Sequence, residues 1–449
     1  MRNKLLITYI ISFFFIFINF KAFSDQQFNF EITEIEILEE GNLFKGNKRG
    51  KIVSDNGILI KANNFTYNKS KNILNANGKV IIEDLINKYQ IFSDEIKYFK
   101  NQDLIITNGN SKAIDDNKKI ITSKIFEYDR QNNIINAKDN VTIEDELNKY
   151  KLFTNDITYK RNFSEIISNG NTNLIVENKY NIKSKNVTFY EKEKIIKSKY
   201  KTQIKDNNSK LYNIENFSYS INNQIIKGEN ITIVTNFNLP KSDKFVFSSG
   251  IINLNNSNFI AKDTEILIHN TVFGNNENEP RLKGVSSKKI NELTTINKGI
   301  FTSCKNNDKC PPWSIKAEKI VHDKANKKIT YDNSVLKIYD IPVFYFPKFF
   351  HPDPTVDRQS GFLQPRISNS NILGNSFTLP YYNVISSNKD NTFSTTIFDE
   401  NTQMFQNEFR QKNKNSNFIA DLGYVNNFKS NLFNKKKNIS HLFAKYNRS

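Results

Sequence analysis

The sequence predicts an all-β protein in which a long stack of repeated strands is followed by a smaller group of longer strands. Apolar and polar residues alternate with a period of two along most of the 449-residue chain, as they do in strands with one buried face. In the first half, a short hydrophobic and aromatic motif returns at nearly constant spacing, and after Tyr382 the alternating segments become longer. These patterns indicate two β-architectures within one chain.

The first 24 residues have the pattern of a secretory signal peptide. Arg2 and Lys4 precede an apolar segment that ends at Phe20, and Ala22-Phe23-Ser24 offers small residues where a signal peptidase cleaves. An uncleaved membrane anchor is the alternative, although the apolar segment is short for a helix that needs about 20 residues to span a bilayer. We therefore expect residues 1–24 to be a signal peptide and the mature chain to lie outside the cytoplasm.

The net charge narrows the function only slightly. The formal charge is +18 at pH 7, and such an excess of basic residues is compatible with an anionic partner such as a nucleic acid or a phosphorylated lipid. However, acidic residues are interspersed with the basic ones, and Lys, Asn and Ile are common throughout the chain. Because an exported protein rarely meets nucleic acid, we expect no nucleic-acid partner.

The region from about residue 28 to residue 270 contains an internal repeat. Residues 79–110 and 140–171 are two copies of one unit, since half of their aligned positions are identical. Along the whole region, hydrophobic–x–aromatic triplets recur every 30 or 31 residues, at Phe65–Tyr67, Ile96–Tyr98, Phe126–Tyr128, Ile157–Tyr159, Val187–Phe189 and Phe217–Tyr219. A β-unit of about 30 residues repeated in this way is typical of stacked repeats that bury their apolar faces on one another.

The inward-facing residues of these repeats allow two interpretations. The apolar positions of two equivalent strands are Leu74, Val80, Ile82, Ile135, Val141 and Ile143. They fill a closed core if the layers of the stack meet, or they line a slot for acyl chains if the layers stay apart. Periodicity alone does not decide between a core and a slot.

A junction separates the repeats from the longer strands. Residues 272–303 are rich in polar and turn-forming residues, so we place the domain boundary there. Both cysteines, Cys304 and Cys310, follow directly, and eight of the ten prolines lie between Cys304 and Tyr382. In an oxidising compartment two cysteines favour a disulfide, with each other or with a partner elsewhere, and their spacing has no second pair that would indicate a metal site.

No arrangement of residues indicates enzymatic chemistry. The four histidines are scattered without metal-ligand spacing, and the sequence has neither a glycine-rich phosphate loop nor a serine nucleophile motif. The acidic residues near His322 have no catalytic partner placed by the sequence. We therefore expect no catalytic residue, no cofactor and no metal.

Four motifs from Pro311 onward carry a resemblance to a known family. They are PPWSIKA from Pro311, IVHD from Ile320, IPVFYFPKFFHPDPTVDRQSGFLQP from Ile341 and TLPYY from Thr378. These motifs closely resemble the LptD/OstA family of lipopolysaccharide-assembly proteins. The resemblance implies that residues 25–271 form a periplasmic OstA/LptA-like β-jellyroll, that residues 272–340 form a linker and junction, and that residues 341–449 form the N-terminal part of an outer-membrane β-barrel.

The resemblance also assigns roles to particular prolines. Pro342 and Pro347 bracket an apolar run that includes Tyr345, which confines the run to a strand edge, and by resemblance this segment is the entry into the barrel. Pro365 and Pro380 match prolines of the first two barrel strands, where the family weakens strand pairing to form a lateral gate. The alternative for Pro365 and Pro380 is the ordinary place of prolines at strand ends and turns.

The family also bears on the cysteines and on the length of the chain. Cys304 matches a family cysteine that bonds toward the far end of the barrel, whereas Cys310 has no such counterpart. Alternating segments at residues 392–398, 403–409, 418–425 and 440–446 read as transmembrane strands. They are too few for the family's barrel, so we expect the chain to be a fragment or a truncated product.

These implications lead to one leading function and one alternative. The leading function is transport of lipopolysaccharide from a periplasmic LptA-type bridge protein into the outer leaflet of the outer membrane, through a lateral gate. An LptE-type plug lipoprotein and the barrel-assembly machinery are implied as further partners. The alternative is a secreted β-solenoid adhesin with a barrel anchor, whose repeats would bind cells or glycans.

Overall fold

The structure is a computed structural model, and it describes residues 28–239, 242–269, 279–305, 311–353, 356, 358–371, 373–399, 401–428 and 437–448. These residues form strands, turns and three one-turn 3₁₀ helices, η1 (Glu39–Gly41), η2 (Lys100–Gln102) and η3 (Arg161–Phe163). The predicted all-β fold is confirmed. Within the described ranges, no helix has the length and apolar character needed to cross a membrane. The predicted signal peptide and Cys310 lie outside these ranges.

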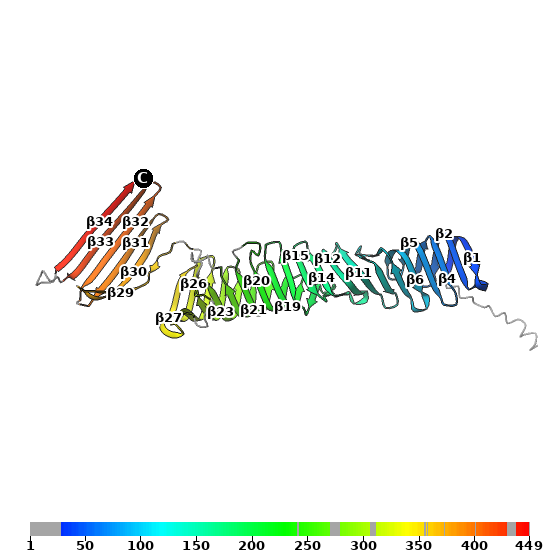
Figure 1. Cartoon of the computed structure of the whole chain (residues 1–449), viewed down its shortest axis with the longest axis horizontal. Helices are drawn as coiled ribbons and strands as arrows, with labels where there is room; N and C mark the ends of the chain where they lie inside the picture. Colours follow the sequence, from blue (N-terminus) through cyan, green and yellow to red (C-terminus); the bar gives the residue numbers. More distant parts are fainter. Residues whose placement is uncertain are drawn as a thin grey trace, which may run out of the picture. The chain divides into compact units, whose positions relative to one another are not determined.

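The chain divides into two compact units, and the first contains residues 1–269 and 280–291. Figure 1 shows its strands side by side along the row from β1 to β23. They are β1 (Phe28–Leu38), β2 (Leu43–Ser54), β3 (Ile58–Ala62), β4 (Asn64–Asn68), β5 (Ile73–Asp84), β6 (Tyr89–Phe99), β7 (Leu104–Asn108), β8 (Ser111–Asp115), β9 (Ile120–Ser123), β10 (Ile125–Asp129), β11 (Ile134–Asp145), β12 (Tyr150–Lys160), β13 (Glu165–Asn169), β14 (Asn171–Val176), β15 (Tyr180–Lys185), β16 (Thr188–Tyr190), β17 (Ile195–Ser198), β18 (Thr202–Asp206), β19 (Leu211–Ser220), β20 (Ile225–Val234), β21 (Lys244–Asn253), β22 (Phe259–Leu267) and β23 (Arg281–Ile290).

Long strands in this unit bend at their middle and pair with two shorter strands. The C-terminal half of β12 pairs with β13, and its N-terminal half pairs with β14. Gly170 separates those two short strands with a φ of +94°, a conformation that costs glycine little. The pairing of β5 with β6 shifts register between Asn77 and Val80, and that of β11 with β12 shifts between Lys138 and Val141. The two bends recur at the spacing of the predicted duplication, so each repeat is built around one bend.

The bend places the two halves of each strand on opposite sides of an apolar interior. A continuous cluster of buried side chains runs from Phe28 to Ala261. Its largest fully buried members are aromatic and come from successive repeats, including Tyr98, Tyr128, Tyr150, Tyr212, Tyr219, Phe126, Phe189 and Phe217. Burial of this apolar surface is the main favourable term for the stack, and each repeat supplies only one layer of it.

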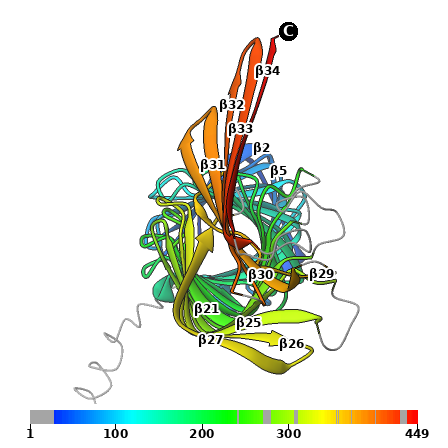
Figure 2. The ribbon, with the colours of Figure 1, turned by 90° about the vertical axis from the view of Figure 1, so that its left-hand side faces the viewer.

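The second unit contains residues 270–279 and 292–449. Four of its strands pair in chain order, namely β24 (Leu293–Thr302), β25 (Trp313–Asp323), β26 (Lys328–Ile338) and β27 (Ile341–Pro352). A separate seven-stranded sheet follows, shown by the long arrows in Figure 2, with β28 (Gly361–Phe362), β29 (Arg366–Ser370), β30 (Gly374–Ser386), β31 (Lys389–Phe398), β32 (Gln403–Asn413), β33 (Ser416–Phe428) and β34 (Lys437–Arg448).

The sheet of longer strands begins later than the sequence suggested. We expected the barrel segment to start at residue 341, but β27 pairs along its length with β26, and the seven-stranded sheet starts at Gly361. The apolar run of β27, bracketed by Pro342 and Pro347, indicates a strand at the edge of a sheet but does not specify which neighbour that strand takes.

Candidate functional site

The interior of the first unit contains all six residues that the sequence proposed for a lipid slot. Each has a side chain that is 0–1% exposed, and each belongs to the continuous apolar cluster; they are Leu74, Val80, Ile82, Ile135, Val141 and Ile143. The structure therefore brings them together inside one closed interior. Contact between these residues and lipid remains a prediction.

Two rows of turns meet across the open side of the bent strands, opposite the bends. One row includes the turns that follow β2, β5, β8 and β11, and the other includes the turns that follow β4, β6, β10, β12 and β16. We call the line along which they meet the mouth of the stack. Asn56, in the first row, donates to Asp103 in the second row at 2.9 Å and to the hydroxyl of Tyr98 in β6 at 2.7 Å. Side-chain contacts across the mouth therefore close the interior.

The most buried of these contacts is made by Arg130. Its guanidinium donates to Asp84 at 2.9 Å, to Asp103 at 2.7 Å and to the carbonyl oxygen of Asn56 at 3.0 Å. The side chains of Arg130 and Asp84 are 2% and 0% exposed, and Tyr128 also donates to Asp84 at 2.7 Å. This network satisfies a buried charge pair with hydrogen bonds, as such a pair requires.

The electrostatics of Asp84 follow from these contacts. Burial by itself raises the pKa of its carboxyl group, but hydrogen bonds from Arg130, the backbone of Asn87 and Tyr128 outweigh burial and hold that pKa below 3.8. Asp84 is therefore ionised at neutral pH and remains paired with the guanidinium.

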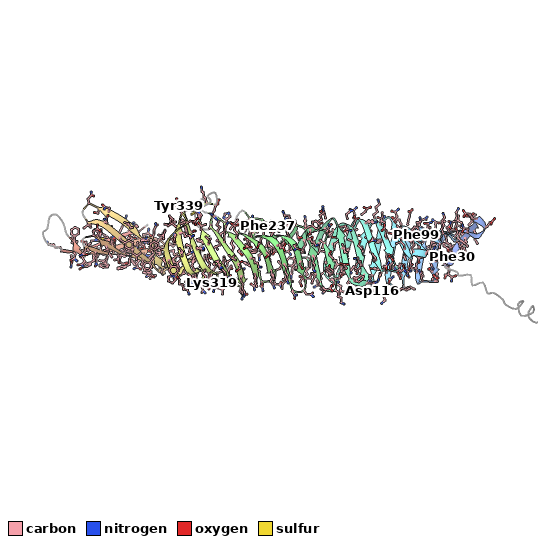
Figure 3. The ribbon with its side chains drawn as sticks, turned by 90° about the horizontal axis from the view of Figure 1, so that it is seen from below. Phe30, Phe99, Asp116, Phe237, Lys319 and Tyr339 are labelled. Atoms are coloured by element: carbon pink, nitrogen blue, oxygen red, sulfur yellow. The ribbon has the colours of Figure 1, made fainter. Side chains whose placement is uncertain are left out.

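Further ion pairs cross the mouth at neighbouring repeats. Lys100 contacts Asp55, and Arg161 pairs with Asp116 at 2.6 Å and donates to the carbonyl oxygen of Asn87. Asp116 is labelled in Figure 3, where it lies at the margin of the stack.

The next ion pair along the mouth has the opposite polarity. There Lys119 comes from the first row of turns and lies 2.6 Å from Glu191 in the second. The sequence analysis missed all of these residues, although one signal was present, because Lys100, Arg130, Arg161 and Glu191 recur every 30 or 31 residues.

In the seven-stranded sheet, the two proposed gate prolines lie at one interruption. β28 and β29 both pair with β30 and together form an edge of the sheet. Phe362 pairs with Tyr381 and Arg366 with Thr378, so three edge residues, ending with Pro365, face two residues of β30. Pro380 is one of those two.

The position of Pro380 decides which strand pairing it weakens. Its carbonyl oxygen accepts a hydrogen bond from the amide of Leu363 at 2.9 Å. Because the N–H and C=O groups of one strand residue point toward the same neighbour, the N–H that proline lacks faces the edge strand. On its other side β30 keeps regular pairing with β31, where Pro380 lies opposite Ser394. The break therefore weakens the edge strand alone.

This sheet has one apolar face. Cross-strand pairs such as Phe377 with Ile397, Phe405 with Tyr424 and Leu422 with Leu442 place large apolar side chains on the same side. Other members of this face are Leu379, Tyr381, Phe393, Phe409, Phe418 and Tyr446. Many are at least 37% exposed, so this face has no covering layer among the described residues.

The opposite face is mainly polar and holds an ion cluster. Asp390 is 9% exposed, pairs with Arg410 at 2.7 Å and also contacts Arg358. Arg358 donates to the hydroxyl of Tyr382 at 2.9 Å, which anchors the segment before β28 to the sheet. β34 is an exception to the polar pattern because its Phe443 lies on this face, opposite Asp421.

The remaining predicted residues lie in or near strands β24 to β27. Pro342, Tyr345 and Pro347 belong to β27, where Tyr345 pairs with Val335 and is 60% exposed. They are not brought together with Pro365 or Pro380 in one sheet. Cys304 is half buried with its Sγ 3.8 Å from the carbonyl oxygen of Trp313. Both disulfide assignments remain predictions because Cys310 is not among the described residues.

Comparisons with known proteins identify sequences similar to this chain. LPS-assembly protein LptD of Yersinia enterocolitica is 36% identical over 121 residues, which cover 27% of this chain and 15% of that protein. LptD of Hahella chejuensis is 32% identical over 179 residues, covering 38% and 21%. LptD of Pseudomonas aeruginosa is 30% identical over 138 residues, covering 30% and 14%. Each match therefore spans about a fifth or less of the relative's length. No protein-family model matches the chain.

One solved structure shows a weak likeness. It is LptH, described as the LptA homologous periplasmic component of the lipopolysaccharide transport device from Pseudomonas aeruginosa. The likeness has a TM-score of 0.24 and 17% sequence identity, and it covers 25% of this chain and 83% of LptH. A score this low supports no conclusion about the fold. The sequence matches to LptD, however, confirm that this chain is similar to the LptD/OstA family, as its motifs indicated.

Proposed function

We propose that this protein takes part in the transport and assembly of lipopolysaccharide at the outer membrane. The observation that carries the proposal is the apolar interior of the first unit, which continues from Phe28 to Ala261 without a break between repeats. The partial similarity to LPS-assembly proteins LptD supports the same function. A continuous apolar interior provides the environment that acyl chains prefer over water.

In this proposal the acyl chains travel inside the stack while the sugars and phosphates stay outside its mouth. Side chains such as Val80 and Val141 contact the chains, and the mouth opens to let the headgroup pass along it. The alternative use of such an interior is purely structural, as a core that never opens. The two uses differ in one observable, which is contact between inward side chains and lipid.

The seven-stranded sheet is the proposed wall in the outer membrane. Its apolar face, with Leu422 and Leu442, would meet lipid tails, and its face with Asp390 and Arg410 would meet water or a protein partner. Strands of a membrane barrel alternate apolar and polar side chains in this way. The interruption at Pro365 and Pro380 is the proposed lateral gate, because the edge strand there lacks a regular set of hydrogen bonds to β30.

The partners proposed for this function follow from the strand edges and the family resemblance. β1 is an edge strand that pairs with β2 and exposes Ile35 and Ile37 by 43% and 58%. Such an edge can receive a strand from another β-protein, so we assign it to the LptA-type bridge. An LptE-type plug lipoprotein and the barrel-assembly machinery are proposed by resemblance alone.

The experiment is depletion of this protein in cells that depend on it, followed by measurement of lipopolysaccharide at the cell surface. We expect surface lipopolysaccharide to fall and the lipid to accumulate in the periplasm or inner membrane. Expression of the complete gene should restore display. Unchanged surface display in depleted cells would overturn the proposal and favour an adhesin.

A further inference from the structure

The ion pairs across the mouth form a row with one member per repeat. The backbone amides of the second row of turns make equivalent hydrogen bonds, from Lys100 to Asn72, from Arg130 to Asp103 and from Arg161 to Asn133, at 3.1–3.2 Å. The next amides, of Glu191, Ile221 and Leu254, bond to the carbonyl oxygens of Ser164, Lys194 and Gln224. These six residues therefore occupy one structural position in successive repeats.

The side chains at this position change character along the stack. The first three, Lys100, Arg130 and Arg161, are basic and reach carboxylates of the first row of turns. Glu191 reverses the polarity and meets Lys119. Ile221 and Leu254, each 7% exposed, are apolar. Among the described residues, the row of ion pairs at this position thus ends after four repeats.

Beyond Glu191, the contacts across the mouth join a charged side chain to a neutral one. Gln224 donates to Glu177 at 3.2 Å, and Lys210 donates to the hydroxyl of Ser257 at 2.5 Å. The interior stays buried there, since Ile226 and Ile231 are 0% exposed, as are Leu74 and Ile143. The two parts of the mouth therefore differ in the charge of their contacts and not in the burial of the interior.

The geometry of the row suits a phosphorylated amphiphile. Successive turns of one row are two strands apart, which places their basic groups about 10 Å from one another at the usual strand spacing. Arginine and lysine bind phosphate by charge-assisted hydrogen bonds that resemble those they make to carboxylates. A phosphate can therefore replace the carboxylate at each position while an acyl chain enters below it.

We propose that this row is a latch on the mouth, and that an anionic amphiphile opens it by exchanging its phosphate groups for the carboxylates on Lys100, Arg130 and Arg161. This inference rests on the proposed transport function and specifies how the substrate is admitted. Asp55 and Asp116 have side chains that are 53% and 40% exposed, so they return readily to water when released.

The ion pairs at the three basic positions differ in how deeply they are buried. The Arg130 pair is the most buried, and Asp84 would lose its partner in a site with 0% exposure. Leaving a buried charge unpaired is costly, so opening is slowest at this position. The acyl chains therefore meet their main barrier between the repeats that carry Asp84 and Arg130.

The test uses full-length protein in detergent with a leucine-sized diazirine amino acid at Val141. The probes are a lipid A that carries two phosphates and the same lipid with its phosphates removed, and photo-crosslinking to each is measured. One variant combines Asp55→Asn and Asp116→Asn, which removes the carboxylates that pair with Lys100 and Arg161. A second combines Lys100→Gln and Arg161→Gln, which removes the phosphate partners. The exposed pair Lys151 and Glu144 supplies the control, Lys151→Gln with Glu144→Gln.

The latch predicts that the two variants differ with phosphorylated lipid and agree with dephosphorylated lipid. Relative to wild-type protein, crosslinking to phosphorylated lipid should rise about three- to tenfold in the Asn variant. In the Gln variant it should be about three- to tenfold lower than in the Asn variant. With dephosphorylated lipid the two variants should crosslink equally. Circular dichroism confirms that each variant is folded.

The failure of the latch is distinguishable from the failure of the transport function. If wild-type protein crosslinks to lipid but both variants match the control, the interior carries lipid and the latch is overturned. If each variant crosslinks to phosphorylated and dephosphorylated lipid to the same extent, phosphate exchange is overturned. If no folded form crosslinks to either lipid, both the latch and the transport function are overturned.

Discussion

At the residue scale, Arg130 shows how one side chain joins turns that lie far apart in the sequence. Its partners Asn56, Asp84 and Asp103 precede it by 74, 46 and 27 residues. Because Asp84 is held ionised and out of water, the guanidinium is the group that makes its burial tolerable. Truncating this arginine should therefore lower the free energy of unfolding by more than the loss of a surface ion pair does.

The substitution Arg130→Gln tests this claim on stability. We expect the free energy of unfolding to fall by about 3–5 kcal/mol, since removing one partner leaves an uncompensated buried carboxylate. Urea unfolding of the full chain, followed by circular dichroism, measures the change. The matched control is Lys151→Gln, which breaks an exposed ion pair with Glu144 and should change stability by less than about 1 kcal/mol. Equal effects of the two substitutions would contradict the assigned role of Arg130.

His351 makes the second unit sensitive to pH. Its ring nitrogen lies 2.8 Å from the hydroxyl of Tyr331, and burial lowers its pKa below 6.5, although hydrogen bonding to the Pro352 carbonyl and the charge of Asp353 oppose this shift. Because the folded-state pKa is depressed, the unfolded chain binds more protons below pH 6.5. Stability is therefore complete above that pH and is lost as pH falls through the folded pKa.

The only tryptophan can report this loss, because Trp313 makes an edge-to-face contact with Phe301, whose ring lies 6.0 Å from the His351 ring. The denaturant midpoint from tryptophan fluorescence should fall between pH 7.5 and pH 5.5 in the wild type. The fall should be smaller in His351→Gln. His322 and Asp353 contact each other beside this site and are unchanged in both proteins, so identical pH profiles would rule out His351 as the responsible group.

At the element scale, the edge formed by β28 and β29 is the weakest part of the seven-stranded sheet. Its pairing with β30 is broken at residues 363–365, whereas β31, β32 and β33 pair continuously over most of their lengths. The missing N–H of Pro380 points at this break. An edge strand held in this way can separate from β30 without disturbing the rest of the sheet.

Pro380→Ala should strengthen that edge. The alanine supplies an N–H toward the break, and one added hydrogen bond contributes about 0.5–1.5 kcal/mol. Amide hydrogen exchange in residues 361–370, measured by mass spectrometry, should slow by about two- to tenfold. Pro347→Ala in β27 is the control and should leave those residues unchanged. If Pro380→Ala exchanges as fast as the wild type, the proline does not set the opening of the edge.

The apolar face of β30 to β34 makes a second prediction at this scale. Leu422 lies between Asn407 and Leu442 on that face and is 53% exposed. Leu422→Arg would place a charge against lipid tails, at a cost of about 2–4 kcal/mol near the middle of the membrane. The fraction of full-length protein assembled in outer-membrane fractions should fall.

The control for this substitution lies on the opposite face. Gln406 pairs with Gly423 and donates to Asp421 at 3.4 Å, so Gln406→Arg gains a nearby carboxylate and should assemble normally. Equal assembly of both variants would contradict a lipid-facing role for the face that contains Leu422.

At the scale of the whole molecule, the features that could be predicted from the sequence are those that depend on the pattern of residues within single strands. The 30-residue repeat and the inward direction of Leu74 through Ile143 follow from alternation within single strands, and both agree with the structure. The ion pairs of the mouth could not be predicted in the same way. Lys100 and Asp55 are 45 residues apart, and they meet only because two rows of turns face each other after the strands bend.

The strand that pairs with β27 also could not be predicted from the local sequence pattern. Residues 341–350 form an almost continuous apolar run, which indicates a strand but not its neighbour, and the structure pairs that strand with β26. In contrast, Pro365 and Pro380 were predicted as a pair through the family resemblance. The structure adds that they lie at the same interruption, on the side of β30 that faces the edge strand.

The central claim, that the interior of the stack carries acyl chains, is tested most directly by photo-crosslinking in living cells. A leucine-sized diazirine amino acid is placed at the inward positions Val80 and Val141 of the full-length protein, and at the outward position Lys151. Our account predicts crosslinks to lipopolysaccharide from both inward positions and none from Lys151. Absence of lipopolysaccharide from both inward positions in correctly assembled protein would contradict it and leave the interior as a structural core.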